Sequence, residues 1–445
     1  MTYGQLLRGN ADFRRLWTGQ VVSEIGDWLN NIAVLALVIE LAGERRVGLA
    51  IAIYAITRHL PLFLFGPVAG VVVDRADRRR VMIAADVLRA TLALGFLVAD
   101  RIGSLGLIYV VGSALFCVSA FFNAAKRASV PNLVAGTEEL LTANSLSAST
   151  TAATIAVGSA LGGLVATFIG REIVFVANAA TFLVSAEMIR RIRAATRSSD
   201  HQQHSFHLRS APTEGTATTL NLQRIAATLR HAATEFRDGL SYVRREETLF
   251  AVFAVAACWG LGNGAARALY SIFGAQLGVA DASGWVERPT DFGISVLFVA
   301  MGLGGVLGAP LARRFNQAAG DSLGTRMGRS LLFDGFALAV FSLTPSLWTA
   351  SLVLVAREMN FAIWWTAQQT IIMRRTSDNF AGRVFASFET LTTLMMVGSM
   401  FASGAAADTY GIRPVAVVAG IIISCSGLLW FALRRRRTAV LSSFR

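Results

Sequence analysis

The sequence predicts an all-α integral membrane protein with twelve transmembrane helices. Of its 445 residues, 54% are hydrophobic and only 16% are charged, whereas soluble domains carry about 25% charged residues. The apolar residues form blocks of about 20, the length that crosses the hydrocarbon core of a bilayer as a helix. The blocks do not alternate apolar and polar residues as the strands of a membrane barrel would. Helices are therefore the expected spanning elements.

The apolar blocks divide into two groups of six. The first group covers roughly 15–41, 48–73, 80–99, 105–125, 140–169 and 172–190. The second group covers roughly 249–277, 292–312, 328–344, 348–373, 381–409 and 413–433. This pattern predicts an N-terminal six-helix bundle over 1–190 and a C-terminal six-helix bundle over 248–445 that ends in a basic cytoplasmic tail.

The segment 191–247 between the two groups is predicted to be a cytoplasmic linker. Its first half is rich in Ser, Thr, Ala and His, a composition typical of disordered chain. Its second half has apolar residues at helical spacing with basic residues between them, which predicts an amphipathic helix on the inner membrane surface. His201, His204 and His207 lie in the polar half. They are interpreted as a solvated loop rather than a metal site.

The basic residues indicate the orientation in the membrane. If both termini are cytoplasmic, 31 of the 41 basic residues fall in cytoplasmic segments. Only six fall in external loops, namely Arg45, Arg46, Arg101, Arg171, Arg288 and Arg413. Positive charge accumulates on the cytoplasmic side of membrane proteins. The sequence therefore predicts a multi-pass protein of the bacterial inner (plasma) membrane with both termini inside.

Several function classes are disfavoured by the composition. The net charge of +13 does not indicate nucleic-acid binding, because the arginines lie in short loops between apolar blocks. The three cysteines lie inside apolar blocks, so a disulfide framework is not expected. The sequence has no phosphate-binding loop of the Walker type and no nucleophile motif. Neither an enzyme nor a cofactor is expected.

The turn after the second predicted span carries the clearest motif, formed by Gly70, Asp74, Arg75, Arg78 and Arg79. These residues resemble the signature G-x-x-x-D-R-x-G-R-R/K of the major facilitator superfamily, with an acid (Asp77) where Gly is usual. A degenerate second copy of this motif follows the eighth predicted span, at 308–314, with Ala in place of the acid.

The resemblance implies the major facilitator fold, in which two six-helix bundles rock about a central path. It also implies that the loop helps to hold the cytoplasmic side closed. Gly70 is expected to let helices approach closely. The alternative is that the arginines of this loop only set the topology.

The fifth predicted span contains three small residues, Gly158, Gly162 and Gly163, at helical spacing. The run is similar to the G-P-x-x-G-G sequence associated with antiporters of the superfamily, with Ser159 where Pro is usual. Small residues allow tight helix packing, and packing alone is the alternative interpretation.

Further stretches, at 13–17 with 26–28, at 128–134 through 143–146, and at 382–386, resemble one bacterial branch of the superfamily. That branch contains macrolide-efflux and enterobactin-exporter-like proteins. The likeness covers nearly the whole chain, but none of these pieces defines the cargo.

Charged residues at membrane depth are costly and usually functional. Asp27 and Arg58 lie near the middle of the first two spans, so an ion pair between them is plausible. Arg89 lies three residues from Asp86, which predicts a pair within one helix. The candidates for proton coupling are Asp27, Glu24, Arg58 and Glu389. The alternative is a static pair that only fixes the helix register.

The resemblance implies that the first, fourth, seventh and tenth helices line the cargo cavity. The candidates share amide, charged or indole side chains and are Asn30, Asn31, Asn123, Asn263, Arg267, Glu358, Trp364, Trp365 and Gln368. Aromatic rings with scattered amides suit bulky amphipathic molecules. Alternatively, the two tryptophans anchor the helix at the membrane interface.

Together these features predict a secondary active transporter, a proton-coupled multidrug antiporter that exports a small amphipathic, drug-like compound by alternating access. A carrier for a narrow range of metabolites, siderophores or lipid-like molecules is the alternative within transport. A membrane receptor or lipid-modifying enzyme is the alternative from another class. The expected partners are the lipid bilayer, the small-molecule substrate and protons, and the protein is expected to be a monomer.

Overall fold

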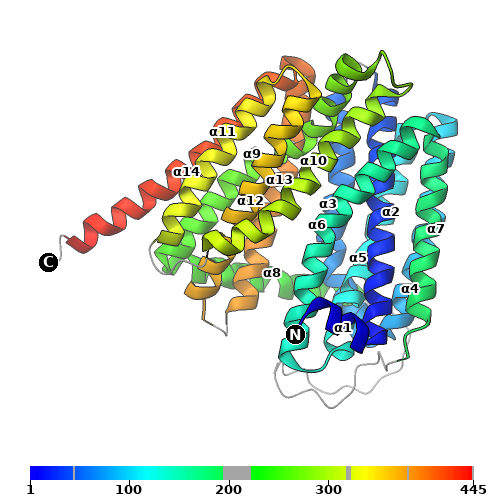
Figure 1. Ribbon diagram of the computed structural model, residues 1–445. Helices are drawn as coiled ribbons and strands as arrows, with labels where there is room; N and C mark the ends of the chain where they lie inside the picture. Colours follow the sequence, from blue (N-terminus) through cyan, green and yellow to red (C-terminus); the bar gives the residue numbers. More distant parts are fainter. Residues whose placement is uncertain (44–45, 194–221, 317–321, 378–379, 443–445) are drawn as a thin grey trace.

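Fourteen α-helices make up the part of the chain that the computed structural model describes, residues 1–43, 46–193, 222–316, 322–377 and 380–442 (Figure 1). The N-terminal helices are α1 (Tyr3–Gly9), α2 (Ala11–Ala42), α3 (Val47–Arg75), α4 (Arg78–Ile102), α5 (Leu105–Leu133), α6 (Gly136–Phe168) and α7 (Arg171–Arg190). The others are α8 (Leu222–Arg245), α9 (Glu247–Ala282), α10 (Pro289–Asn316), α11 (Ser322–Leu343), α12 (Leu347–Arg375), α13 (Ala381–Tyr410) and α14 (Ile412–Ser442). The predicted all-α fold is confirmed.

Ten of the described helices are long and apolar enough to cross a membrane, namely α2–α7, α9, α10, α13 and α14. α11 and α12 are also long enough to cross a membrane, but their most apolar stretches are more polar than those of these ten helices. Arg326, Arg329 and Asp334 interrupt α11, and Arg357 and Glu358 interrupt α12. Both nevertheless lie among the apolar helices, since α11 packs on α14 and α12 packs on α10.

Local capping explains where several helices begin and end. Asp77, Ser104 and Ser346 precede α4, α5 and α12, and their side chains accept hydrogen bonds from the free backbone N–H groups of the first turn. Gly103 ends α4 in the left-handed conformation at φ 68°, which glycine adopts without a steric penalty. The short turns between helices are thus encoded locally.

The helices form two groups, which we call the N-terminal half (α1–α7) and the C-terminal half (α9–α14). Within each group the long helices pack on one another (Figure 1). The halves meet mainly along two helix pairs, α6 with α10 and α3 with α13. A Cβ added at Gly48 of α3 would lie 2.3 Å from the carbonyl oxygen of Gly404 in α13. Backbones touch at this crossing, which only residues without a Cβ allow.

Charged contacts join the two halves at the end opposite α1. Arg171, the first residue of α7, donates to both carboxylate oxygens of Asp291 in α10, at 2.9 and 2.8 Å. It also pairs with Glu40 of α2. Asp408 of α13 accepts from the backbone N–H groups of Gly48 and Leu49 at 2.6 and 2.9 Å, so it caps the first turn of α3 across the interface. We call this the closed end.

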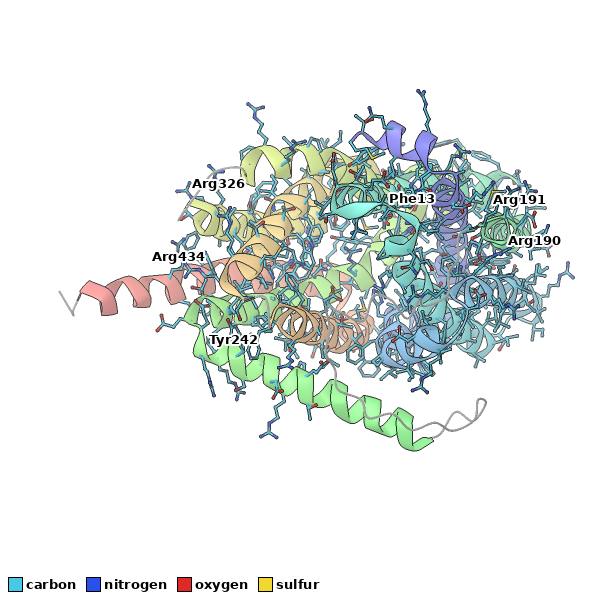
Figure 2. All side chains as sticks on the ribbon, turned by 90° about the horizontal axis from the view of Figure 1, so that it is seen from below. Phe13, Arg190, Arg191, Tyr242, Arg326 and Arg434 are labelled. Carbon is cyan, nitrogen blue, oxygen red and sulfur yellow. The ribbon has the colours of Figure 1, made fainter. Side chains whose placement is uncertain are left out.

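α8 lies outside both halves, along the edge of the molecule seen in Figure 2. It packs on α13 and also touches α9 and α3. The ring of Tyr242 stacks on Phe380 at 4.7 Å, and the Ser387 hydroxyl donates to the carbonyl of Phe236 at 3.2 Å. The end of the linker is therefore attached to the C-terminal half.

Replacing Arg171 with Gln tests the closed end. Asp291 is fully buried, and removing one partner of a buried ion pair costs about 3 kcal/mol or more. We expect a clear fall in the melting temperature of the purified protein.

The matched control is Arg101→Gln, because Arg101 pairs with Glu172 at 3.5 Å while both side chains are more than half exposed. That pair should contribute less than about 1 kcal/mol. Equal losses in the two variants would contradict the assignment of the closed end to the Arg171–Asp291 pair.

Candidate functional site

A cavity of about 670 Å³ lies between α2, α5 and α6, away from the closed end. Its polar lining comes from Gln20, Asn123, Lys126, Arg127, Asn144, Ser147 and Thr151. Of the candidates that the sequence suggested for the cargo cavity, Asn123 lines it. We call this the N-terminal cavity.

A carboxylate beside this cavity ties three helices together. Glu24 of α2 pairs with the Lys126 ammonium of α5, with 3.5 Å between Oε1 and Nζ. The same carboxylate accepts from Gln20 at 2.8 Å and from the hydroxyls of Thr154 and Thr151 of α6 at 3.1 and 3.4 Å. Any change in the charge of Glu24 therefore acts on α2, α5 and α6 together.

Lys126 was not among the residues that the sequence singled out. It is the single lysine among 41 basic residues, and its position at the end of an apolar block was the available signal. A lysine reaches a carboxylate with a compact charge on a flexible stem, whereas arginine presents a planar fork. The single lysine of this arginine-rich chain therefore lies in the wall of the N-terminal cavity, beside Glu24.

Asp27 lies one turn further along α2 and pairs with Arg89 of α4 at 4.0 Å. The expected pair between Asp27 and Arg58 is not present. Arg58 donates instead to the Asn31 side chain, and its guanidinium lies 5.3 Å from the ring centroid of Trp28. The prediction failed because equal depth in the membrane does not fix the direction in which two side chains point.

Arg89 is buried and has several partners inside the N-terminal half. It hydrogen-bonds Asp86 within α4, so the pair predicted from their spacing is present. Its guanidinium also lies 4.0 Å from the ring of Phe122 and 4.4 Å from that of Phe182. Two acids and two aromatic faces therefore compensate this charge.

The C-terminal half contains a second buried arginine cluster. Arg357 of α12 pairs with Asp334 of α11 and with Glu358, both at 3.2 Å. It also donates to the Asn263 side chain of α9 at 3.1 Å and to the Tyr270 hydroxyl. Glu358 and Asn263, expected to line the cargo cavity, are thus engaged within their own half. The sequence interpretation missed Asp334, although it is the one acid in the ninth apolar block.

The two candidate tryptophans belong to an aromatic cluster. Trp364 and Trp365 pack against each other and against Trp259 and Phe361, with ring centroids 4.8 to 6.2 Å apart. Gln368 lies one turn further along α12 and is buried, and neither atom of its amide has a protein partner. Buried amides are normally hydrogen-bonded, so Gln368 has unused donor and acceptor capacity.

The remaining candidates lie apart from the N-terminal cavity. Asn30 is buried and its Oδ1 has no protein partner. Arg267 points to the Met301 sulfur at 3.8 Å. Glu389 is exposed on α13, and no ion pair involving it is recorded in the described part of the chain.

The loop between α3 and α4 makes its contacts inside the N-terminal half. Arg78 donates to the carbonyl of Ala128 at 2.8 Å, and Arg79 donates to that of Arg190. Asp74 and Arg75 are exposed. A Cβ added at Gly70 would meet no atom within 4 Å. The expectation that Gly70 permits a close helix approach is therefore wrong for this conformation, although Ala69 and Val73 on the same stretch of α3 are buried.

Glycines of α6 lie where other helices cross it closely. A Cβ added at Gly158 would lie 2.7 Å from the Ile25 carbonyl, and one at Gly162 would lie 2.7 Å from the Leu29 Cα, both on α2. One at Gly163 would lie 1.9 Å from the Ser295 hydroxyl of α10. α6 is thus closely packed on both sides, against α2 of its own half and against α10 of the other half.

Metal ligation has no support in the described ranges, where no group of three His, Cys, Asp or Glu residues is close enough to hold an ion. The three linker histidines, His201, His204 and His207, lie outside the described residues.

Two halves of long apolar helices that are joined at one end, with a polar cavity in the N-terminal half away from that end, are typical of a membrane transport protein. The family model of the Major Facilitator Superfamily matches residues 16–399. The chain belongs to this superfamily. It is a multi-pass transporter of the plasma membrane, and not an enzyme.

Curated relatives match over most of the chain. It is 24% identical to an uncharacterized MFS-type transporter, YfiS, of Bacillus subtilis (strain 168), over 95% of this chain and 93% of that one. It is 27% identical to a putative bacilysin exporter, BacE, of Bacillus subtilis, over 88% of each chain. It is 22% identical to macrolide efflux protein A of Streptococcus pyogenes, over 94% of each chain. The predicted likeness to bacterial macrolide-efflux proteins is thereby confirmed.

Solved structures share the fold at low sequence identity. The nucleoside transporter NupG superposes with a TM-score of 0.70 at 11% identity, over 94% of this chain and 99% of that one. A bacterial homologue of the iron transporter ferroportin, in an inward-facing state, superposes with a TM-score of 0.67 at 14% identity, over 95% and 98%.

The Arg357 cluster can be tested by a double substitution. Arg357→Gln leaves Asp334 buried without its cation, which should lower the free energy of unfolding by about 3 kcal/mol or more. Adding Asp334→Asn removes the uncompensated charge, so the double variant should recover part of the loss. Both can be compared by thermal melting in detergent. A double variant no more stable than Arg357→Gln would contradict a direct energetic coupling between the two residues.

Proposed function

We propose that the protein exports a small amphipathic, drug-like compound in exchange for protons, by alternating access. The observation that carries this proposal is the Glu24–Lys126 pair beside a polar cavity away from the closed end. In this proposal α11 and α12 also cross the bilayer, which gives twelve spans with both termini cytoplasmic. Residues 1–190 and 248–445 are the two moving bundles, 191–247 is their cytoplasmic linker, and the protein acts as a monomer.

Proton binding at Glu24 would change the wall of the cavity. The ionised carboxylate pairs with Lys126 and accepts from Gln20, Thr151 and Thr154. A proton on Glu24 removes the charge that holds Lys126, so the wall is altered where cargo binds. Cargo enters from the cytoplasm as Glu24 releases its proton, and Glu24 takes up a proton from outside as the cargo leaves. Because cargo binds when Glu24 has lost its proton and leaves when Glu24 regains one, each cycle exchanges cargo for a proton.

The second acid, Asp27, links this event to the buried charges of the N-terminal half. It lies on the same helix as Glu24 and contacts Arg89, which is also paired with Asp86. A shift of α2 would change the Asp27–Arg89 distance. Arg58 acts on the same helix through Asn31. Glu389, exposed on α13, is the weaker candidate for coupling.

The rest of the cycle requires the closed end to open and the other end to close. The Arg171–Asp291 pair would then separate. On the cytoplasmic side, the exposed Asp74 and Arg75 would then meet the C-terminal half, while Arg78 and Arg79 hold the loop that follows Gly70 against the N-terminal half. Glycines 158, 162 and 163 keep α6 tightly packed on its neighbours during the movement.

The names of the relatives support export as the direction, since two of them are described as exporters or efflux proteins. The cargo surface would include Asn123 in the N-terminal cavity. The indoles of Trp364 and Trp365, together with Gln368, Asn263, Glu358, Arg267, Asn30 and Asn31, would contribute as the halves move.

A narrow-specificity carrier is the second candidate, and a specific observation favours it. Two cations, Lys126 and Arg127, and three amides, Gln20, Asn123 and Asn144, line the N-terminal cavity. A cavity of this character suits a polar metabolite with an acidic group better than an apolar cation.

The test measures accumulation of dyes, macrolides and siderophores in an efflux-deficient host that expresses the protein, with and without a protonophore. We expect lowered accumulation that the protonophore abolishes. Glu24→Gln should weaken export about tenfold or more, within the range that coupling energies of 1–3 kcal/mol produce. Glu389→Gln is the comparison and should have a smaller effect.

Membrane levels of each variant must match those of the unaltered protein for these results to count. Export that survives the protonophore would exclude proton coupling. Export that fails in Glu389→Gln but not in Glu24→Gln would move the coupling site to the C-terminal half. No change for any compound would favour the narrow carrier.

A further inference from the structure

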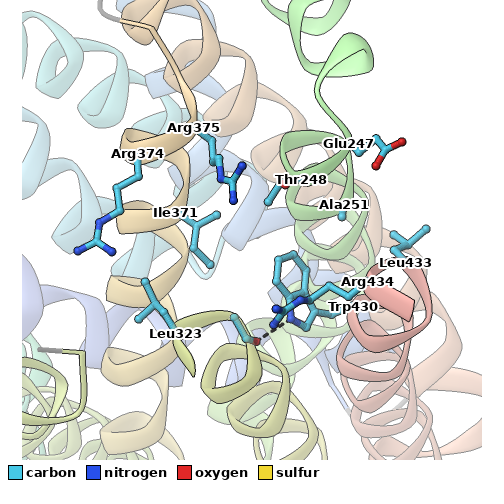
Figure 3. A pocket seen from close by; sticks show the side chains of 11 residues that line it. Glu247, Thr248, Ala251, Leu323, Ile371, Arg374, Arg375, Trp430, Leu433 and Arg434 are labelled. Carbon is cyan, nitrogen blue, oxygen red and sulfur yellow. Dashed lines mark hydrogen bonds between the residues drawn. The ribbon is translucent and has the colours of Figure 1, made fainter. Parts of the chain in front are cut away.

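A second cavity lies inside the C-terminal half, separate from the Glu24–Lys126 pair. It has a volume of about 370 Å³ and lies between the first turns of α9 and α11 and the later turns of α12 and α14. Figure 3 shows Arg374 and Arg375 of α12 on one side of it and Trp430 and Arg434 of α14 on the other.

The charge of this cavity is predominantly positive. Three arginines line it against one acid, Glu247. Arg375 reaches Glu246 only at 3.9 Å, and no hydrogen bond or ion pair of Arg374 is recorded among the described residues. A guanidinium carries five N–H donors. The two arginines of α12 therefore have donors available for an anion.

The opposite wall combines the Trp430 indole with the Arg434 guanidinium, and it is closely fitted. Trp430 is buried and donates its indole N–H to the carbonyl of Gly324 at 2.6 Å. The Arg434 guanidinium lies 5.9 Å from the same ring. A Cβ added at Gly324 would lie 2.9 Å from Trp430 Cζ2 and 2.7 Å from Arg434 Nη1. This wall therefore requires glycine at position 324.

We propose that this cavity binds the phosphate group of an anionic amphiphile, a phosphate ester with an apolar substituent. The guanidinium group of arginine matches phosphate oxygens in geometry and charge, and the indole wall suits the apolar part. The source is either the headgroup of an acidic phospholipid, as in other basic pockets between membrane helices, or a soluble phosphate ester. The bound phosphate bridges α12 and α14 beside the start of α9.

The test uses the full-length protein in detergent and native mass spectrometry with added phosphatidylglycerol. We expect phosphatidylglycerol to bind well above phosphatidylcholine, and Arg374→Gln/Arg375→Gln to bind it about tenfold more weakly, a factor equal to about 1.4 kcal/mol. The matched control is Arg244→Gln/Arg245→Gln, which removes two exposed consecutive arginines at the end of α8, outside the cavity. This control should bind as the unaltered protein does.

Competition distinguishes the two sources. Glycerol phosphate or inorganic phosphate that displaces the lipid at equal concentration assigns the site to a soluble phosphate, and failure to displace it assigns the site to a lipid. Arg374→Lys/Arg375→Lys keeps the positive charges but lacks the planar guanidinium fork, so it should bind the lipid with intermediate affinity. If the double glutamine variant does not fold, this lysine variant provides the test. Equal loss in the α8 control, or no preference over phosphatidylcholine, would overturn the proposal.

Discussion

One arginine is buried among acids in each half of the protein, and the arrangement of the surrounding helices depends on it. A charge at membrane depth is costly unless partners compensate it, and a buried pair that loses one partner is strongly destabilised. Arg89 is held by Asp86 and Asp27, which joins α4 to α2. Arg357 is held by Asp334 and Glu358, which joins α12 to α11. Each half is thus fixed internally by a charge cluster, and it can move as a unit.

The contacts between the halves are of a different kind. Glycines at the α3–α13 and α6–α10 crossings bring the helices close together. At the α6–α10 crossing the Ser295 hydroxyl of α10 also donates to the Ser159 carbonyl of α6 at 2.9 Å. Among the described residues, the ion pair that joins the halves, Arg171–Asp291, lies at the closed end. The signature loop at the other end makes its recorded hydrogen bonds within the N-terminal half. A molecule that is rigid within each half and joined at one end can open alternately to the two sides.

The sequence was sufficient for the fold class, because block length, hydropathy and arginine placement depend on position along the chain. The Asp86–Arg89 pair was also predictable, since both residues lie on one helix at a fixed spacing. Ion-pair partners that lie on different helices were not predictable. Sequence gives the depth of Arg58 but not its direction, so the expected contact with Asp27 was wrong. Lys126 and Asp334 were missed because their partners lie on other helices, at angles set by packing.

The direct test of the account measures distances between the halves by double electron–electron resonance. Spin labels at positions 141 of α6 and 373 of α12, both exposed and away from the closed end, would report opening, with the native cysteines replaced. Proton-driven alternating access predicts two distance populations whose proportions change between acidic and alkaline pH, and a much smaller change in Glu24→Gln. A single distance that is the same at both pH values would contradict it.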